Sequence, residues 1–319
     1  DWPFAHAELV PYLEEAERFL GVSGPSHYPW DSTRRYLLPP VPGNAPAELM
    51  RRGCAAVGIR TSSAPLLALS RPREAEQRGT CLGCGYCHQG CFNGAKASMD
   101  VTYLPVALRA GAEIRAECFV HAFDVGHDGA VRGVVYRQGG QDVVQRCRAV
   151  FLCAGGVETP RLLLMTGLAN SSGQVGRNFM AHTATQVWGT FTDETHSSRG
   201  FPASLISEDM LRPPDADFAG GYLMQSLGIV PVTWATQVAR QRGLWGQPLV
   251  DYLARFNHVA GIGINGECLP QEGNRLELSD ERDGRGDTRC PDLRQRLPLT
   301  IGRGAPHVGH GVLHPRLLL

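Results

Sequence analysis

Four cysteines that could share one metal centre lie within eleven residues of this sequence, at Cys81, Cys84, Cys87 and Cys91. Their spacing, C-x2-C-x2-C-x3-C, matches the bacterial ferredoxin run that holds an iron–sulfur cluster, although Phe92 stands where that run has proline. The loop CLGCGYCHQGCFNGAK is rich in glycine, which allows the tight turns that bring thiolates together. Four thiolates in a compact loop also suit a structural zinc ion. A third interpretation is that these cysteines are buried thiols or form one or two local disulfides.

The other cysteines of the chain are scattered, at Cys54, Cys118, Cys147, Cys153, Cys268 and Cys290. A disulfide framework would be spread more evenly, and a chain of 319 residues does not need one. Lys96, the only lysine, follows the cluster and would either screen thiolate charge or face solvent.

A second segment with a chemical pattern covers residues 149–167. AVFLCAGG predicts a buried strand that stops on two glycines, and ETPRLLLMTG predicts a helix capped by Thr159, with Pro160 in its first turn and Gly167 after its last. Nucleotide-binding α/β domains use such a unit, because glycine lets a phosphate or ribose approach the helix N-terminus. This segment lacks the full GxGxxG fingerprint, so an ordinary βα unit remains the alternative.

The elements that would position these segments alternate between helices, loops and short strands. Periodicity predicts helices at 5–20, 47–57, 101–110 and 245–256, and a loop at 74–98. Runs typical of β-strands cover 112–125, 130–138 and 142–150, which predicts a meander, and recur at 182–191, 220–230 and 258–269.

Composition excludes several classes of function. Lys plus Arg and Asp plus Glu both number 31, so the net charge is zero, which argues against nucleic acid as a main partner. No apolar run approaches the ~18–20 residues of a membrane span. The first twenty residues have no basic and no apolar region of a signal peptide, and they lack an initial Met. Localisation therefore stays open between the cytoplasm and the periplasm.

Five segments, in order along residues 1–285, resemble the glucose–methanol–choline (GMC) oxidoreductases, a family of flavoenzymes. They are WPFAHAELVPYLEEAERFLGVSG, CLGCGYCHQGCFNGAKASMDVTYLPVALRAGAEI, CAGGVETPRLLLMTGL, SSGQVGRNFMAH and GINGECLPQEGNRLEL. The resemblance implies an α/β (mixed α+β) fold, with a partial FAD-binding Rossmann-like domain and a sheet-based substrate domain. Residues 1–100 would be a substrate-domain or lid segment with the Cys-rich loop 81–96, residues 101–178 part of the FAD-binding domain, and residues 179–285 the substrate domain.

The implied activity is FAD-dependent oxidation of an alcohol or sugar hydroxyl, with electrons passed to an external acceptor such as a cytochrome or another subunit. By position, Val120 resembles the backbone contact to the adenine end of FAD. Cys153, Ala154 and Gly155 resemble the turn beside the ribose and diphosphate. Some bacterial members carry an iron–sulfur cluster, and the spacing of Cys81, Cys87 and Cys91 matches that ligand set, with Cys84 as an added candidate.

Two departures from the family pattern lead us to expect an incomplete copy. The family's opening strand–GxGxxG–helix does not precede Asp1, and the catalytic histidine region has no counterpart, so no catalytic residue is assigned. After Gly286 the pattern stops, and residues 286–319 are an atypical tail that we interpret as frameshifted. The alternative from another class is an iron–sulfur- or zinc-binding electron-transfer module without flavin chemistry of its own.

Overall fold

The computed structural model describes residues 3–279, and the chain within them divides into two compact units. Among the described residues, unit 1 contains residues up to Ala112 together with His182–Glu267, and unit 2 contains Glu113–Ala181 and residues 268–279. The boundaries expected from the sequence were 100/101 and 178/179. The tail at 286–319 lies outside the described residues.

Unit 1 carries most of the helices. They are α1 (His6–Leu20), α2 (Ala45–Ala56), α3 (Tyr103–Arg109), α5 (Pro231–Arg242) and α6 (Gln247–Leu253), with short 3-10 turns η1 (Glu74–Glu76), η2 (Met99–Val101) and η3 (Phe256–His258). The sequence chemistry explains their ends. Gly21 closes α1 in the left-handed conformation, and the Asn44 side chain caps α2 by accepting a hydrogen bond from the Ala47 amide at 3.0 Å.

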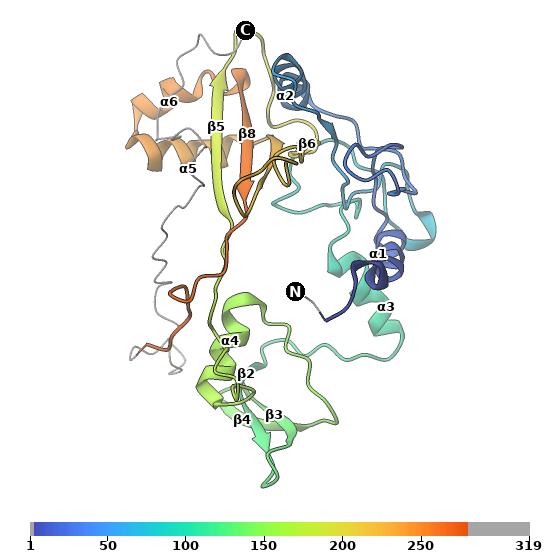
Figure 1. The fold of residues 1–319 in the computed structure, drawn as a ribbon, viewed down its shortest axis with the longest axis vertical. Coiled ribbons are helices and arrows are strands. Elements are labelled where there is room, and N and C mark those ends of the chain that lie inside the picture. Colours follow the sequence, from blue (N-terminus) through green and yellow to red (C-terminus); the bar gives the residue numbers. More distant parts are fainter. Residues whose placement is uncertain (1–2, 280–319) are drawn as a thin grey trace. The chain divides into compact units, whose positions relative to one another are not determined.

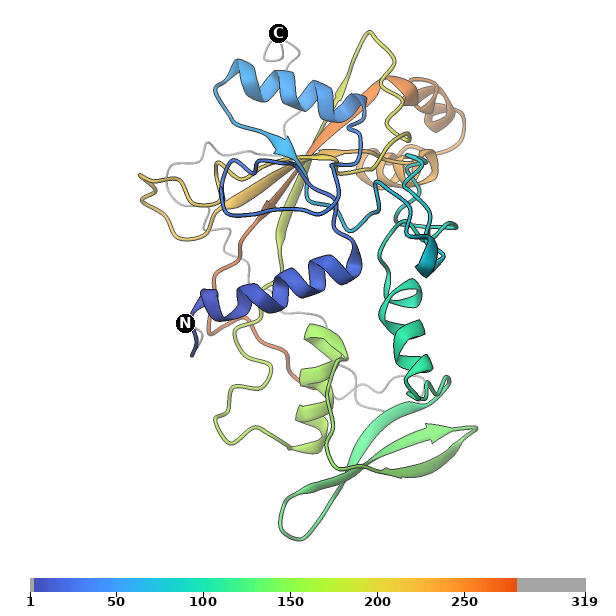
Figure 2. The same cartoon turned by 90° about the vertical axis from the view of Figure 1, so that its right-hand side faces the viewer.

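An antiparallel sheet forms the centre of unit 1 (Figure 1). Its order is β1 (Ser62–Ser63), β6 (Leu205–Ser207), β7 (Tyr222–Leu227), β8 (Val259–Gly266) and β5 (Thr183–Thr190). Helix α2 packs on one face through Met50, where Met224 and Ile262 meet it, and Figure 2 shows α2 lying across that face. Helix α5 covers part of the other face, where Trp234 packs against Trp188. Alternation along the strands thus gives the sheet two apolar faces.

Unit 2 is built on a three-stranded antiparallel meander. Its strands are β2 (Phe119–Val125), β3 (Val131–Gln138) and β4 (Gln141–Arg146), in the order β2-β3-β4. Helix α4 (Gly155–Thr166) packs beside β2. The meander predicted from the sequence is therefore confirmed.

The strand predicted at 149–154 is wrong. Residues 147–153 form no strand, and Phe151 is 89% exposed. A continuously apolar strand is typical of parallel sheets that are buried on both faces. All pairs between the named strands of the described residues are antiparallel, so this segment finds no parallel neighbour there.

Helix α4 also begins earlier than predicted, at Gly155. Thr159 does not occupy the cap position. Its hydroxyl instead accepts a hydrogen bond from the Ala154 amide at 3.2 Å, so Pro160 lies inside the helix. Gly167 does end the helix in the left-handed conformation, as predicted. In unit 1, α5 was not predicted at all.

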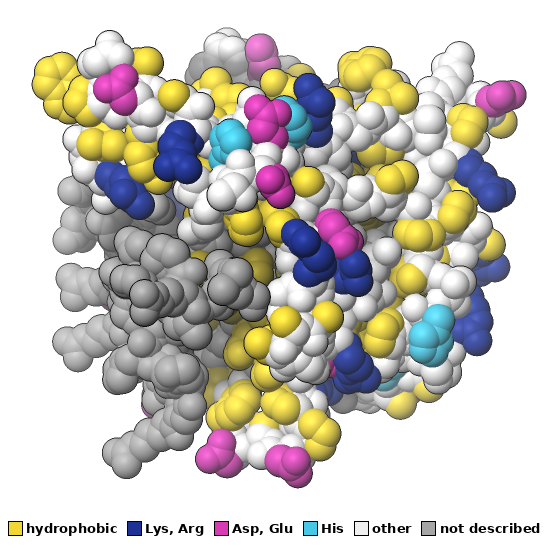
Figure 3. Space-filling view, turned by 90° about the horizontal axis from the view of Figure 1, so that it is seen from above, with side chains coloured by type: hydrophobic (Ala, Val, Ile, Leu, Met, Phe, Trp, Pro, Cys, Tyr) yellow, Lys and Arg dark blue, Asp and Glu magenta, His cyan; other side chains and the backbone are white. Residues whose placement is uncertain are grey.

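The expected fold class, a mixture of helices and sheets, is confirmed. Among the described residues, no helix combines the length and the apolar character that crossing a bilayer requires. On the face drawn in Figure 3, basic and acidic side chains are interspersed, as the balanced composition suggests.

Candidate functional site

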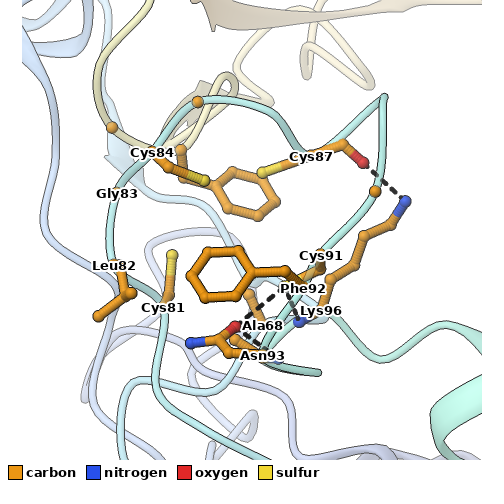
Figure 4. Close-up of a pocket in the computed structure, with 15 residues that line it drawn as sticks. Ala68, Cys81, Leu82, Gly83, Cys84, Cys87, Cys91, Phe92, Asn93 and Lys96 are labelled. Carbon is orange, nitrogen blue, oxygen red and sulfur yellow. Dashed lines mark hydrogen bonds between the residues drawn. The ribbon is translucent and has the colours of Figure 1, made fainter.

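The four clustered cysteines line one pocket in unit 1. Figure 4 shows the sulfur atoms of Cys81, Cys84 and Cys87 turned toward one another beside the ring of Phe92. Cys84 is exposed and the other three are half-buried. All nine cysteines in the described part of the chain are free thiols, so the local disulfides considered above are not formed there.

Glycine conformation and close packing shape the first half of this loop. Gly83 and Gly85 both have positive φ, 65° and 80°. A Cβ on Gly85 would lie 1.9 Å from the carbonyl oxygen of Ser198, so only glycine fits there. The Gly200 amide donates to the carbonyl oxygen of Gly83 at 2.6 Å, which fixes the cysteine loop against residues 198–201 of the same unit.

Polar contacts order the second half of the loop around Cys91. The Lys96 amide donates to the Cys91 sulfur at 3.4 Å, and that thiol donates to Asn93 Oδ1 at 3.2 Å. The Lys96 ammonium donates to the carbonyl oxygen of Cys87 at 2.8 Å. Lys96 therefore does not simply face solvent, since it ties the segments that carry Cys87 and Cys91 together (Figure 4).

Burial and the neighbouring thiols raise the pKa of two of these thiols, Cys81 and Cys87. Burial raises the pKa of Cys87 to about 11, the neighbouring thiols add to the rise, and Lys96 opposes it. Burial likewise raises the pKa of Cys81, with Cys84 and Cys91 contributing in the same direction. The mutual effect of the four groups shows that they lie within electrostatic reach of one another.

The donor set fits a thiolate-ligated centre in its chemistry. Four sulfur ligands suit zinc or an iron–sulfur cluster, and the amide that donates to the Cys91 sulfur is the kind of hydrogen bond that tunes such clusters. The cysteine side chains do not have the geometry of a bound metal site. Within residues 3–279, no three His, Cys, Asp or Glu side chains are grouped closely enough to hold a metal ion. Closure around an ion would require rotation of the cysteine side chains.

The four residues singled out for flavin contact all lie in unit 2. Val120 is in β2, and Cys153, Ala154 and Gly155 lead into α4, which packs beside that strand. Gly155 has φ of 86°, and no atom comes within 4 Å of the position of a Cβ there. The helix N-terminus is thus open and presents backbone amides, which suits an anionic or ribose group of a nucleotide.

A literal G-x-G-x-x-G string occurs at Gly261–Gly266, within a segment for which the sequence predicts a β-strand and no nucleotide-binding unit. The structure places it in β8, an antiparallel strand, where the Trp188 ring packs over Gly261. A dinucleotide fingerprint must lead from a strand into a helix, so this string is not a phosphate loop. Its glycines make room for Trp188 and for Leu227, which lies over Gly263.

The fold of this chain has a counterpart among solved structures. The chain matches pyridoxine 4-oxidase from Mesorbium loti with a TM-score of 0.52 and 15% identity, over 92% of this chain and 55% of that one. The fold of this chain therefore resembles the fold of that solved structure.

The sequence comparisons find one family model that matches part of the chain. The GMC oxidoreductase model matches residues 40–184, a range that contains the four clustered cysteines and the β2–α4 unit. This match supports the resemblance to the GMC oxidoreductases that its five segments led us to expect.

Relatives with assigned activities cover most of this chain. It is 28% identical over 308 residues to the 2-methyl-1,2-propanediol dehydrogenase of Mycolicibacterium austroafricanum, covering 90% of this chain and 54% of the relative. It is 27% identical over 314 residues to the fructose dehydrogenase large subunit of Gluconobacter japonicus, covering 90% and 55%. The gluconate 2-dehydrogenase flavoprotein of Pantoea cypripedii is 26% identical over 317 residues, covering 87% and 51%. The chain spans about half the length of these curated relatives.

Proposed function

We propose that this chain belongs to an FAD-dependent oxidoreductase that oxidises the CH–OH group of an alcohol or a sugar and passes the electrons to an external acceptor. The observation that carries the proposal is the family match over residues 40–184, together with relatives that are named as dehydrogenases of a diol, a sugar and a sugar acid.

The β2–α4 unit supports a role in holding FAD. In this proposal, the backbone at Val120 contacts the adenine end, and Cys153, Ala154 and Gly155 receive the ribose and diphosphate at the open N-terminus of α4. The helix dipole and the backbone amides of the first turn would favour a negative group there. FAD, when bound, supplies a hydride acceptor for the carbon that carries the substrate hydroxyl. No catalytic base is assigned to a residue of the described chain.

The cysteine pocket supports electron transfer to an acceptor outside the flavin. Cys81, Cys84, Cys87 and Cys91 would ligate an iron–sulfur cluster, a one-electron carrier whose potential is set by net charge and by hydrogen bonds to its sulfurs. The acceptor would be a cytochrome or another subunit. This partner chemistry is in line with a relative that is itself named as the large subunit of its dehydrogenase.

The pocket alone also favours a second candidate, a zinc- or cluster-binding module without its own flavin chemistry. The two candidates differ in a simple analysis of the purified chain. The first predicts flavin and iron with sulfide, whereas the second predicts zinc, or iron with sulfide, and no flavin.

FAD binding provides the direct test of the first candidate, with a matched pair of variants. Gly155→Ala places a side chain at a positive φ, whereas Gly156→Ala, one residue on, has ordinary φ and open space around its Cβ. We expect saturable quenching of flavin fluorescence by the parent chain, an affinity at least tenfold lower in Gly155→Ala, and no change in Gly156→Ala. Equal affinities in both variants would show that this turn does not receive FAD.

Substrate class is measured separately, by reduction of a dye acceptor in the flavin-loaded protein with a simple alcohol, a diol or a sugar as donor. Reduction by none of the three would contradict the proposed activity even if FAD binds.

A further inference from the structure

Arg78 is buried beneath the cysteine pocket. Its side chain is 1% exposed. The guanidinium donates to three carbonyl oxygens from two segments: Gly94 at 3.0 Å and Ala95 at 3.4 Å on the far limb of the loop, and Leu20 at 3.0 Å at the end of α1. A fixed fork of donors that joins separate segments in this way holds them at a set distance.

The limb that Arg78 holds is the one that carries Cys91. Gly94 also donates through its amide to the carbonyl oxygen of Cys91 at 3.2 Å, and the stem of Arg78 packs at 3.4 Å from the Cβ position of Gly94. Neighbouring backbone contacts continue the pairing, since the Gly79 amide donates to Asn93 O at 2.8 Å. The position of Cys91 therefore depends on the strut that Arg78 forms.

Arg78 also places a buried positive charge near the thiol of Cys91. Its charge interacts electrostatically with Cys91, and the ion-pair partner on its other side, Glu76, is half exposed at 3.4 Å. Solvent weakens the pairing with an exposed carboxylate, so part of the guanidinium charge remains effective toward the pocket. A metal bound by several thiolates carries net negative charge, and a buried cation stabilises it.

We propose that Arg78 is the positioning residue and fixed counter-charge of the cysteine pocket, where it favours an anionic, thiolate-ligated metal centre. This inference rests on the thiolate centre of the proposed function and goes beyond it by assigning a residue outside the cysteine motif. Within the described chain, Arg78 makes no hydrogen bond to a cysteine sulfur. It therefore acts on the metal centre through the position of the loop and through its charge.

Arg73 offers a matched control. It donates to Phe19 O at 2.8 Å and to Arg18 O at 2.5 Å, so it also fixes this region to the end of α1. Within the described chain, its side chain makes no hydrogen bond to the 91–96 limb and is 22% exposed. Arg73→Met thus removes an anchor of α1 without removing the strut or the charge at Cys91.

The experiment titrates the reduced full chain with Cd2+ alone and follows the thiolate-to-cadmium charge-transfer absorption. The signal of the pocket is the part that Cys87→Ser abolishes. We expect the affinity to fall at least tenfold in Arg78→Met, to recover in part in Arg78→Lys, which keeps the charge but not the fork, and to stay unchanged in Arg73→Met. Thermal unfolding of each metal-free variant reports whether the fold is intact.

The outcomes separate the two levels of the proposal. Parent-like affinity in Arg78→Met would overturn the role of Arg78, and equal losses in Arg78→Lys and Arg78→Met would overturn its role as a counter-charge. If Arg78→Met does not fold, the comparison of Arg78→Lys with the parent and with Arg73→Met decides in the same way. A parent chain with no Cys87-dependent signal would overturn the thiolate centre itself, and with it the role of Arg78, while leaving FAD binding at α4 untouched.

Discussion

The sharpest pH prediction concerns the thiol of Cys87 in the metal-free chain. Its pKa is raised from the ordinary value of 9.0 to about 11, first by burial and then by the other three thiols. The thiolate is the form that reacts with an alkylating reagent, so at pH 8 the reactive fraction is about 100-fold smaller than for an unperturbed thiol. Alkylation of Cys87 should rise about tenfold per pH unit up to about pH 11.

Mass spectrometry of the peptide that contains Cys87, after timed exposure to iodoacetamide, measures this profile. Limited access to a half-buried thiol slows alkylation equally at every pH, so the pH of half-maximal rate is the quantity to compare. Lys96 lowers the pKa of Cys87, so Lys96→Met should move that pH higher still. A profile that levels off near pH 9 would refute the reasoning, and so would a downward shift in Lys96→Met.

The same shift has a consequence for stability. The unfolded thiol ionises at lower pH than the folded one, so the folded state binds more protons in that range. Its contribution to folding is therefore present below pH 9 and is lost as the pH rises toward 11.

Three further predictions concern the framework of unit 1. Met50→Ala should lower the free energy of unfolding by about 2–5 kcal/mol in a denaturant titration, because Met50, on the buried side of α2, is only 2% exposed and its loss leaves a cavity. Asp209→Ala should cost about 1.5–3 kcal/mol by removing the acceptor of the Arg60 amide and guanidinium, and an unchanged midpoint would contradict this. Burial would raise the pKa of Asp209, but its hydrogen bonds outweigh burial and lower it below 3.8, so the contribution of this carboxylate is present above pH 3.8 and is lost on acidification below that. Gly261→Ala should destabilise the chain by about 1–3 kcal/mol in thermal unfolding, since its Cβ would lie 2.6 Å from the Trp188 ring.

Sequence patterns correctly predicted the elements that depend on residues close by in the chain. The meander of unit 2 pairs neighbouring strands, and α1 and α2 have clear periodicity and end signals, so all were found. The apolar run before α4 was read as a buried strand because apolar periodicity cannot report whether a neighbouring strand is there to pair with it. Likewise α5 was missed because a mixed apolar and polar segment after a strand gives a weak helical signal until Trp234 and Val238 are seen packed in the core.

The sequence predicted the grouping of the four cysteines, whereas the contribution of Arg78 and the flavin contacts did not follow from the residue pattern. Cysteine spacing was enough to place the four thiols on one pocket, because glycine turns fold the loop locally. The contribution of Arg78 could not be read from the sequence, since its partners at Leu20 and Gly94 come together only in the folded chain. The flavin contacts remain predictions from family resemblance.

Unit 1 is interrupted in the sequence, and this affects the order in which the chain can fold. Met50 on α2 packs against Ile262 on β8, which lies more than two hundred residues later in the chain. By contrast, β2, β3 and β4 of unit 2 pair within a single stretch of the chain. Contacts between distant residues form slowly, because loop closure is costly before any contact is gained. During synthesis, we therefore expect the meander in the middle of the chain to form first, and the apolar side of α2 to stay exposed to chaperones until β8 has been made.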